Sequence, residues 1–292
     1  MIKRKRALQF LLFIALITSL LFTGFELFYS PRSKVLNQDK HDLYDSSLLW
    51  INSVDKLQSY ADKIFASGNY SSTDTAAYAE IVSGIVKKRF YYGYSYYGTG
   101  HNYLASAIAP FTGTELDAIV LADDILKYPN AACSQQSIVA IDILKKKGLT
   151  YRKVGFFTKE YGGHFAYEIF YNNGWHFFDP TLEAADAPVT NRPSIQELNN
   201  RQDLLINTYN YFGTDHVLKT FKSFFYGKEN AALAPVASLF QGVTSFLSMG
   251  LWLFLLGGFI LVTRSISEEN KLAAKRPAFS FVFGKQAYSK VG

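Results

Sequence analysis

The sequence predicts an α+β protein whose central domain is flanked by two transmembrane helices. Two apolar runs without a charge, residues 7–25 and 243–263, lie near the two ends of the chain. Between them, some segments repeat apolar residues every three or four positions, as helices do, and others alternate them, as strands do. The alternating segments follow one another closely over residues 151–179, so we expect an antiparallel sheet with helices packed on it.

The basic residues of the chain gather beside the apolar runs. The formal charge is +6, of which Lys3 to Arg6 supply +4 and the tail from Arg264 another net +4, leaving −2 for residues 26–263. This distribution indicates membrane topology and argues against a nucleic-acid partner. Each run can cross a hydrocarbon core of about 30 Å. The positive-inside rule then places both termini in the cytoplasm, the chain in the plasma (inner) membrane, and the central domain in the periplasm or outside the cell.

A cleaved signal peptide is the alternative interpretation of the first run. The residues that follow it, Glu26 to Tyr29, contain no small-residue cleavage pattern, which favours an uncleaved anchor. The sequence therefore divides into six predicted segments. These are a basic N-terminus with the first transmembrane helix (1–30), a helical part (31–79), a core domain (80–190), a juxtamembrane helical segment (191–240), the second transmembrane helix (241–263) and a basic cytoplasmic tail (264–292).

The helical part contains two predicted helices. Apolar residues three or four apart predict one helix over Leu48–Phe65, and the residues Ser72 to Asp74 can cap a second over Thr75–Arg89. The aromatic and glycine-rich run 90–98 follows. Such a run can line a groove for carbohydrate or peptide, but a packed loop is the favoured interpretation, and we expect His101 to be a hydrogen-bonded structural residue.

Cys133 is the only cysteine of the chain, so it cannot form a disulfide within it. It is either a buried small apolar residue or a nucleophile. Residues 134–147 predict a buried helix that ends in three lysines before Gly148. Cys133 then lies at the helix N-terminus, where free N–H groups and the helix dipole favour a thiolate and can bind an oxyanion.

Three strands are predicted after this helix, over 151–157, 164–171 and 175–179. Alternation places His164 on the same face of its strand as Ala166 and Glu168. A wide connection through residues 170–173 would set Asp179 opposite His164, whereas a tight Asn173–Gly174 turn would set it opposite Glu168. We expect the wide connection or a bulge. A thiol, an imidazole and a carboxylate in this order are the parts of a cysteine nucleophile with its base and orienting acid.

These residues resemble the transglutaminase-like superfamily, a circularly permuted relative of the papain-like proteases. The resemblance covers about residues 80–185. The residues that carry it are a cysteine opening a helix, Lys147-Gly148-Leu149, Arg152-Lys153-Val154, His164 four before Glu168, Gly174-Trp175 and Asp179-Pro180-Thr181. It implies a papain-like core, with Cys133 as nucleophile, His164 as base and Asp179 as orienting acid. Ala166 stands where members commonly have tryptophan, and Ala131 where glycine is common, which alters the pocket wall.

The resemblance implies acyl transfer or hydrolysis at an amide, as a cysteine protease, amidase or protein cross-linking acyltransferase. Exported proteins or cell-wall peptides are the expected substrates, and the bilayer and envelope proteins the expected partners. The alternative is a non-catalytic binding or scaffold module in a cell-envelope complex. No cofactor and no metal are expected, because the single cysteine excludes a thiolate zinc cluster and the histidines lack ligand spacing. His176 is interpreted as structural, and glutamines 135 and 136 as packing residues.

The juxtamembrane segment contains two more predicted helices. Residues 194–209 are polar and compatible with a helix. An apolar stripe from Val217 to Phe225 predicts another helix that packs on the domain or lies on the membrane surface.

Overall fold

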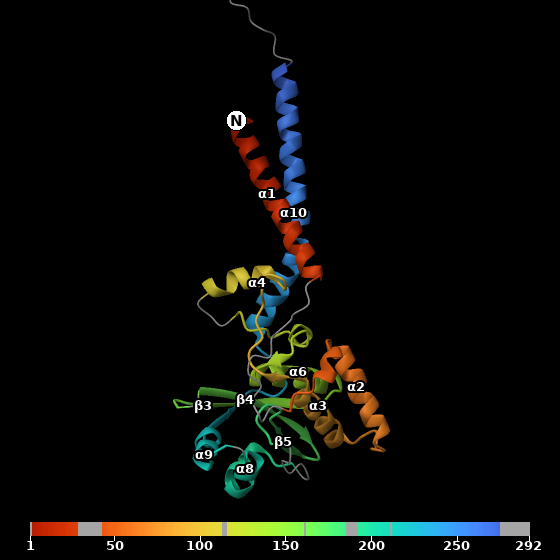
Figure 1. Ribbon diagram of the computed structural model, residues 1–292, viewed down its shortest axis with the longest axis vertical. Coiled ribbons are helices and arrows are strands. Elements are labelled where there is room, and N and C mark those ends of the chain that lie inside the picture. The colour runs from red at the N-terminus through yellow and green to blue at the C-terminus, as the bar shows by residue number, and fades with distance from the viewer. Residues whose placement is uncertain are drawn as a thin grey trace, which may run out of the picture. The chain divides into compact units, whose positions relative to one another are not determined.

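The computed structural model describes residues 2–28, 43–112, 116–160, 162–184, 192–210 and 212–274. His41 therefore lies outside the described residues. The chain forms two compact units, one made of Met1–Gly24 with Met249–Gly292 and the other of Phe25–Ser248. Its elements define an α+β protein with one antiparallel four-stranded sheet and two long apolar helices (Figure 1).

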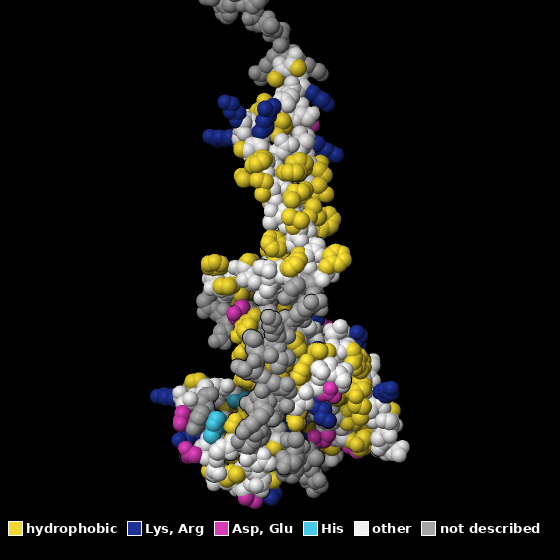
Figure 2. Space-filling model, viewed as in Figure 1, with side chains coloured by type: hydrophobic (Ala, Val, Ile, Leu, Met, Phe, Trp, Pro, Cys, Tyr) yellow, Lys and Arg dark blue, Asp and Glu magenta, His cyan; other side chains and the backbone are white. Residues whose placement is uncertain are grey.

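The smaller unit consists of parts of these two helices, α1 (Ile2–Phe28) and α10 (Pro235–Ala274). They lie side by side in opposite directions. Lys5 donates to Ser265 over 2.7 Å and pairs with Glu269, while Gln9 donates to Thr263 over 2.9 Å. Both helices are long and apolar enough to cross a membrane, and Figure 2 shows apolar side chains along them. α10 extends beyond the predicted span at both ends, so the first part of the expected cytoplasmic tail is helical.

In the larger unit, three helical elements follow one another within residues 43–89. They are a 3-10 turn, η1 (Ser46–Trp50), then α2 (Val54–Ser67) and α3 (Thr75–Arg89). The prediction of one helix over Leu48–Phe65 is wrong, because the Ser53 side chain accepts from the Lys56 N–H and starts a new helix at Val54. The bounds predicted for α3 are confirmed, since Asp74 caps it by accepting from the Ala77 N–H.

A connecting region leads to the helix that bears the cysteine. It contains β1 (Tyr91–Tyr92), α4 (Tyr103–Ile108), η2 (Ala109–Phe111), α5 (Ala122–Ile125) and β2 (Asn130–Ala131), and β1 pairs in parallel with β2. Helix α6 (Cys133–Lys146) follows at once and ends in the basic turn that the sequence predicted. The β1–β2 pair fixes the chain immediately before Cys133.

The sheet has the strand order β5-β4-β3-β6. Its strands are β3 (Thr150–Thr158), β4 (Gly162–Tyr171), β5 (Gly174–Phe178) and β6 (Phe224–Tyr226). Tyr171 pairs with Gly174, so Asn172 and Asn173 alone form the turn, with φ of 47° and 62°. Two successive left-handed residues are typical of a type I′ hairpin turn.

The register of this hairpin differs from both registers that the sequence suggested. Tyr167 pairs with Phe178, and continuing by one residue brings Asp179 opposite Ala166, neither His164 nor Glu168. The expected wide connection is wrong because two asparagines adopt the left-handed conformation and close the turn in two residues. Asp179 still shares a face with His164, in the diagonal position, because the shift is by two residues.

In the described residues between β5 and β6 the chain forms three short helices, namely α7 (Ile195–Asn200), α8 (Gln202–Thr208) and α9 (Thr214–Lys222). The helix expected to continue to Phe225 ends at Lys222 instead. Phe224 and Phe225 belong to β6, where they pair with Phe156 and Gly155 of β3. Sheet pairing with a distant strand therefore overrides the helical spacing.

The core has two parts, one on each side of the sheet. In Figure 1, α6 lies against one side of the sheet, and α8 and α9 lie on the other. The α6 side includes Tyr167 and Ile169 of β4, whereas the α9 side includes Ala166 of β4 with Phe156 and Phe221. Successive side chains of β4 therefore enter the two cores in turn, as expected of a strand buried on both faces.

Candidate functional site

Cys133 is the first residue of α6 and its side chain is buried. Its preceding residue is Ala132, which has no side chain that could cap the helix. Gln135 replaces the cap: its Oε1 accepts from the N–H groups of Ala132 (3.2 Å) and Ser95 (2.9 Å). Its Nε2 donates to the carbonyls of Ser95 (2.9 Å) and Ile119 (2.8 Å). Gln135 therefore holds the start of the cysteine helix, and its interpretation as a packing residue was incomplete.

His164 and Asp179 form a direct pair. The distance from His164 Nε2 to Asp179 Oδ2 is 2.7 Å. The carboxylate is fully buried and accepts three further hydrogen bonds, from the N–H groups of Thr181 and Leu182 and from the Tyr209 hydroxyl, each at 3.1 Å. A carboxylate held by this many donors stays ionised and fixes the ring nitrogen that it faces as N–H.

The imidazole of His164 lies between the carboxylate and the cysteine. Its side chain is 9% exposed and stacks on Phe156, with ring centroids 5.7 Å apart. The Cys133 side chain interacts electrostatically with the imidazole and raises its pKa. Because Nε2 binds Asp179, Nδ1 is the ring nitrogen left for an interaction with the sulfur. The structure thus joins His164 to Asp179 by a hydrogen bond and places Cys133 close enough to act on the imidazole electrostatically.

The electrostatics of the pair favour a charged imidazole. Burial alone would lower the pKa of His164, but the Asp179 carboxylate and the Cys133 side chain raise it to about 10. Burial likewise opposes ionisation of Asp179, yet the His164 charge and hydrogen bond keep its pKa below the ordinary value. An imidazolium between a carboxylate and a sulfur can stabilise a thiolate and later donate a proton.

Tyr92 is a neighbour of the site that the sequence did not reveal. It pairs with Ala131, two residues before the cysteine. Burial and the charges of Cys133 and Asp179 raise the pKa of its phenol to about 12, so the hydroxyl keeps its proton at neutral pH. Only the non-local β1–β2 pairing places it there, and no spacing within the sequence signals that pairing.

The aromatic run around Tyr92 is partly packed and partly open. Tyr91 and Tyr97 are buried, as the packed-loop interpretation requires, whereas Tyr92, Tyr94 and Tyr96 are 46–52% exposed. Tyr94 and Tyr96 lie together, with ring centroids 5.8 Å apart. The run therefore supports the domain with its buried side chains and leaves the rings of Tyr92, Tyr94 and Tyr96 half-exposed.

The remaining histidines of interest make structural hydrogen bonds. His101 binds the Tyr128 hydroxyl (3.1 Å) and Asp124 (3.2 Å), which confirms the expectation of a hydrogen-bonded residue. The ring nitrogens of His176 face the carbonyl oxygens of Arg192 and Tyr171. Within the described ranges, no group of three or more histidine, cysteine, aspartate or glutamate residues is placed to hold a metal ion.

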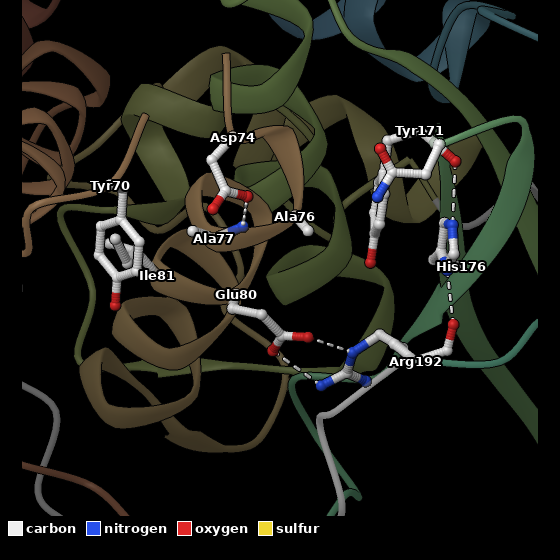
Figure 3. A pocket seen from close by; sticks show the side chains of 10 residues that line it. Tyr70, Asp74, Ala76, Ala77, Glu80, Ile81, Tyr171, His176 and Arg192 are labelled. Atoms are coloured by element: carbon white, nitrogen blue, oxygen red, sulfur yellow. Dashed lines mark hydrogen bonds and ion pairs between the residues drawn. The ribbon is translucent and has the colours of Figure 1, made fainter. Parts of the chain in front are cut away.

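The structure also has a surface pocket of about 730 Å³, to which Cys133, His164 and Asp179 do not belong (Figure 3). Glu80 of α3 and Arg192 line it and form a two-pronged ion pair, with N···O distances of 2.6 and 2.9 Å. Arg192 also pairs with Glu183. Glu80 and Arg192 thus bind each other, Asp74 of the same wall accepts from the Ala77 N–H, and none of Cys133, His164 and Asp179 contributes to the wall.

Comparisons of the chain with family models, with curated proteins and with solved structures found no match.

Proposed function

We propose that the larger unit is a membrane-anchored cysteine enzyme of the transglutaminase-like kind, acting by acyl transfer or hydrolysis on an amide. The observation that supports this most is the hydrogen-bonded pair of His164 and Asp179 with Cys133 as an electrostatic neighbour of the imidazole, the cysteine standing at the start of α6. A structural cysteine needs neither a buried imidazole nor a buried carboxylate behind it. All three residues have side chains that are buried or nearly so, which excludes water from the proton path.

In this reaction each residue has one role. The Cys133 thiolate attacks the amide carbonyl carbon, a C–S bond forms, and the carbonyl oxygen becomes an oxyanion. His164 donates the Nδ1 proton to the amine as the C–N bond breaks, which leaves a thioester. Water or a second amine then attacks the thioester, with His164 accepting its proton. Asp179 keeps the ring oriented and balances its charge throughout.

The oxyanion requires hydrogen-bond donors. The first N–H groups of α6 have no acceptor inside the helix and carry the positive end of its dipole. The protonated Tyr92 hydroxyl, electrostatically coupled to Cys133 and Asp179, is the side-chain donor that we assign to the same oxyanion. The sequence alone did not locate a side-chain donor for this role.

The substrate class follows from topology. With both basic ends in the cytoplasm, the larger unit faces the periplasm or the exterior, where exported proteins and cell-wall peptides supply amides. The second candidate is a binding module for peptide or glycan in an envelope complex. The half-exposed rings of Tyr92, Tyr94 and Tyr96 favour it, because such rings stack on sugars and peptide groups.

The rate of Cys133 alkylation by iodoacetamide, followed against pH on the full chain in detergent, tests the enzyme proposal. We expect His164→Ala to move the midpoint of the profile to higher pH, because the imidazolium that stabilises the thiolate is lost. His216→Ala, on α9, is the matched control and should leave the profile unchanged. Identical profiles for the native chain and His164→Ala would refute the paired nucleophile. Retention of peptide or glycan binding by Cys133→Ala, without amide turnover by the native chain, would support the binding module instead.

A further inference from the structure

We propose that the larger unit rests on the bilayer through an apolar rim that lies in the lipid headgroup region. The rim has two parts that are far apart in the sequence. One is the end of α4 with η2, where Ile108 is 44% and Phe111 88% exposed. The other is the beginning of α10, where Val236, Leu239, Val243 and Phe246 are 72%, 70%, 49% and 71% exposed. Figure 2 shows apolar side chains over α4.

The beginning of α10 has its polarity reversed relative to a helix in water. The four exposed apolar residues recur at intervals of three and four, so they form one stripe. Residues Gln241, Thr244 and Ser248 are instead buried. Gln241 accepts from the Val120 N–H (2.9 Å) and donates to the carbonyls of Leu116 (3.1 Å) and Ala118 (2.8 Å). A helix that turns its polar face to the protein and its apolar face outward is suited to lipid as its outer solvent.

Asn102 ties the two parts of the rim together. It precedes α4 in a left-handed conformation and caps that helix by accepting from the Ala105 N–H. Its own N–H donates to Glu26 of α1 (2.8 Å), and its Nδ2 donates to the Gln241 carbonyl (3.2 Å) and to Thr244 (3.0 Å). Asn102 therefore joins α4 to the end of α1 and to the beginning of α10. These two ends are the parts of the candidate membrane helices that belong to the larger unit.

The distribution of charged residues and the length of α10 also indicate that lipid covers the rim. Residues 90–114 and 230–263 contain no aspartate, glutamate, lysine or arginine. At 1.5 Å per residue, the uncharged part of α10 from Pro235 to Thr263 is roughly 44 Å long, about 14 Å more than a hydrocarbon core needs. The excess corresponds to about nine residues at the beginning of α10, which include Val236, Leu239 and Val243 of the stripe. Apart from the Glu26 carboxylate, which accepts from Asn102 and Ser248, the exposed phenylalanine and aliphatic side chains match the boundary between headgroups and acyl chains.

Depth-dependent fluorescence quenching tests the rim on the full chain. In a Cys133→Ser background, Phe111→Cys and Phe246→Cys each introduce a single cysteine, and Lys219→Cys on α9 serves as the exposed control. Each variant is labelled with an environment-sensitive NBD dye and reconstituted into phosphatidylcholine–phosphatidylglycerol vesicles that contain lipid with a nitroxide at acyl carbon 5 or 12. Circular dichroism and gel filtration, compared with the native chain, verify folding.

We expect the dyes at positions 111 and 246 to emit at shorter wavelength than the control and to lose most of their emission with the carbon-5 nitroxide. The carbon-12 nitroxide should quench them less, because the rim lies at the interface. The dye at 219 should respond only to aqueous iodide. Iodide quenching at 111 and 246 equal to that at 219 would overturn the proposal. Protection that disappears as the chain is diluted in lipid would also overturn it, because a second copy of the chain would then be the occupant.

Discussion

Replacing Asp179 by asparagine should change the pH dependence of stability more than the fold. Asparagine keeps an oxygen for the N–H groups of Thr181 and Leu182, but it presents an amide where the carboxylate faced His164. A neutral amide cannot balance the charge of a buried imidazolium. Burial lowers the pKa of His164, and in the native chain the Asp179 carboxylate is the main group that raises it. Without that carboxylate we expect the ring to be neutral near pH 7.

The size of the effect follows from the pKa of His164. A value of about 10 in the folded chain, against about 6.5 in the unfolded chain, corresponds to about 5 kcal/mol of stability below pH 6.5 and about 4 kcal/mol at pH 7. Because the folded pKa is the higher one, this stability is complete below pH 6.5 and is lost as the pH rises through 10. The lowered pKa of Asp179 describes the same interaction from the other side, so it adds no second contribution.

The measurement is the free energy of unfolding of the full chain in detergent, by urea with fluorescence detection, from pH 5.5 to 10. We expect the difference between the native chain and Asp179→Asn to shrink from about 5 kcal/mol to near zero over this range. His164→Gln, alone and combined with Asp179→Asn, completes a double-mutant cycle that isolates the pair. A difference that stays constant with pH would show that His164 is neutral in the native chain and would refute the reasoning.

Three further predictions concern the surroundings of the pair. Gln135→Leu removes the Gln135 partner of the Ser95 and Ala132 N–H groups and of the Ile119 carbonyl and should lower the free energy of unfolding by about 2–4 kcal/mol; a loss under 1 kcal/mol by urea unfolding would contradict its capping role. Tyr92→Phe should slow acylation of Cys133 by an activated ester about tenfold or more. It should leave alkylation by iodoacetamide unchanged, because only acylation forms an oxyanion. Equal slowing of both reactions would argue for a structural role of Tyr92. Arg192→Met leaves Lys87, at 3.7 Å, as the remaining cation beside the buried Glu183 carboxylate and should cost about 3 kcal/mol, measured by thermal unfolding; native-like stability would mean that the Arg192–Glu183 ion pair is dispensable.

Local signals in the sequence predicted those elements that local interactions determine. Asp74 caps α3 within its own turn, and the three lysines before Gly148 mark the end of α6, so both helices could be located. The three site residues could be named because a thiol at a helix start and an alternating strand are also local patterns. Their catalytic role stays a prediction.

The features that the sequence did not predict depend on distant parts of the chain or on single backbone angles. β6 exists because Phe224 pairs with Phe156 of β3, and apolar spacing over residues 217–225 suits a helix equally well. The hairpin register depends on Asn172 and Asn173 both adopting positive φ, which the Asn-Asn-Gly sequence permits at more than one position. Tyr92 reaches the site only through the pairing of β1 with β2.

The short turn of the β4–β5 hairpin also bears on the order of folding. His164 and Asp179 are separated by 15 residues along the chain, whereas the β3–β6 pairing joins Gly155 to Phe225. Closing the longer loop costs about 1.4 kcal/mol more in chain entropy, and a hairpin forms within about 1–10 μs. The imidazole–carboxylate pair can therefore assemble as a local nucleus before β6 docks. Synthesis from the N-terminus reinforces this order, since both strands of the hairpin leave the ribosome before β6 is made.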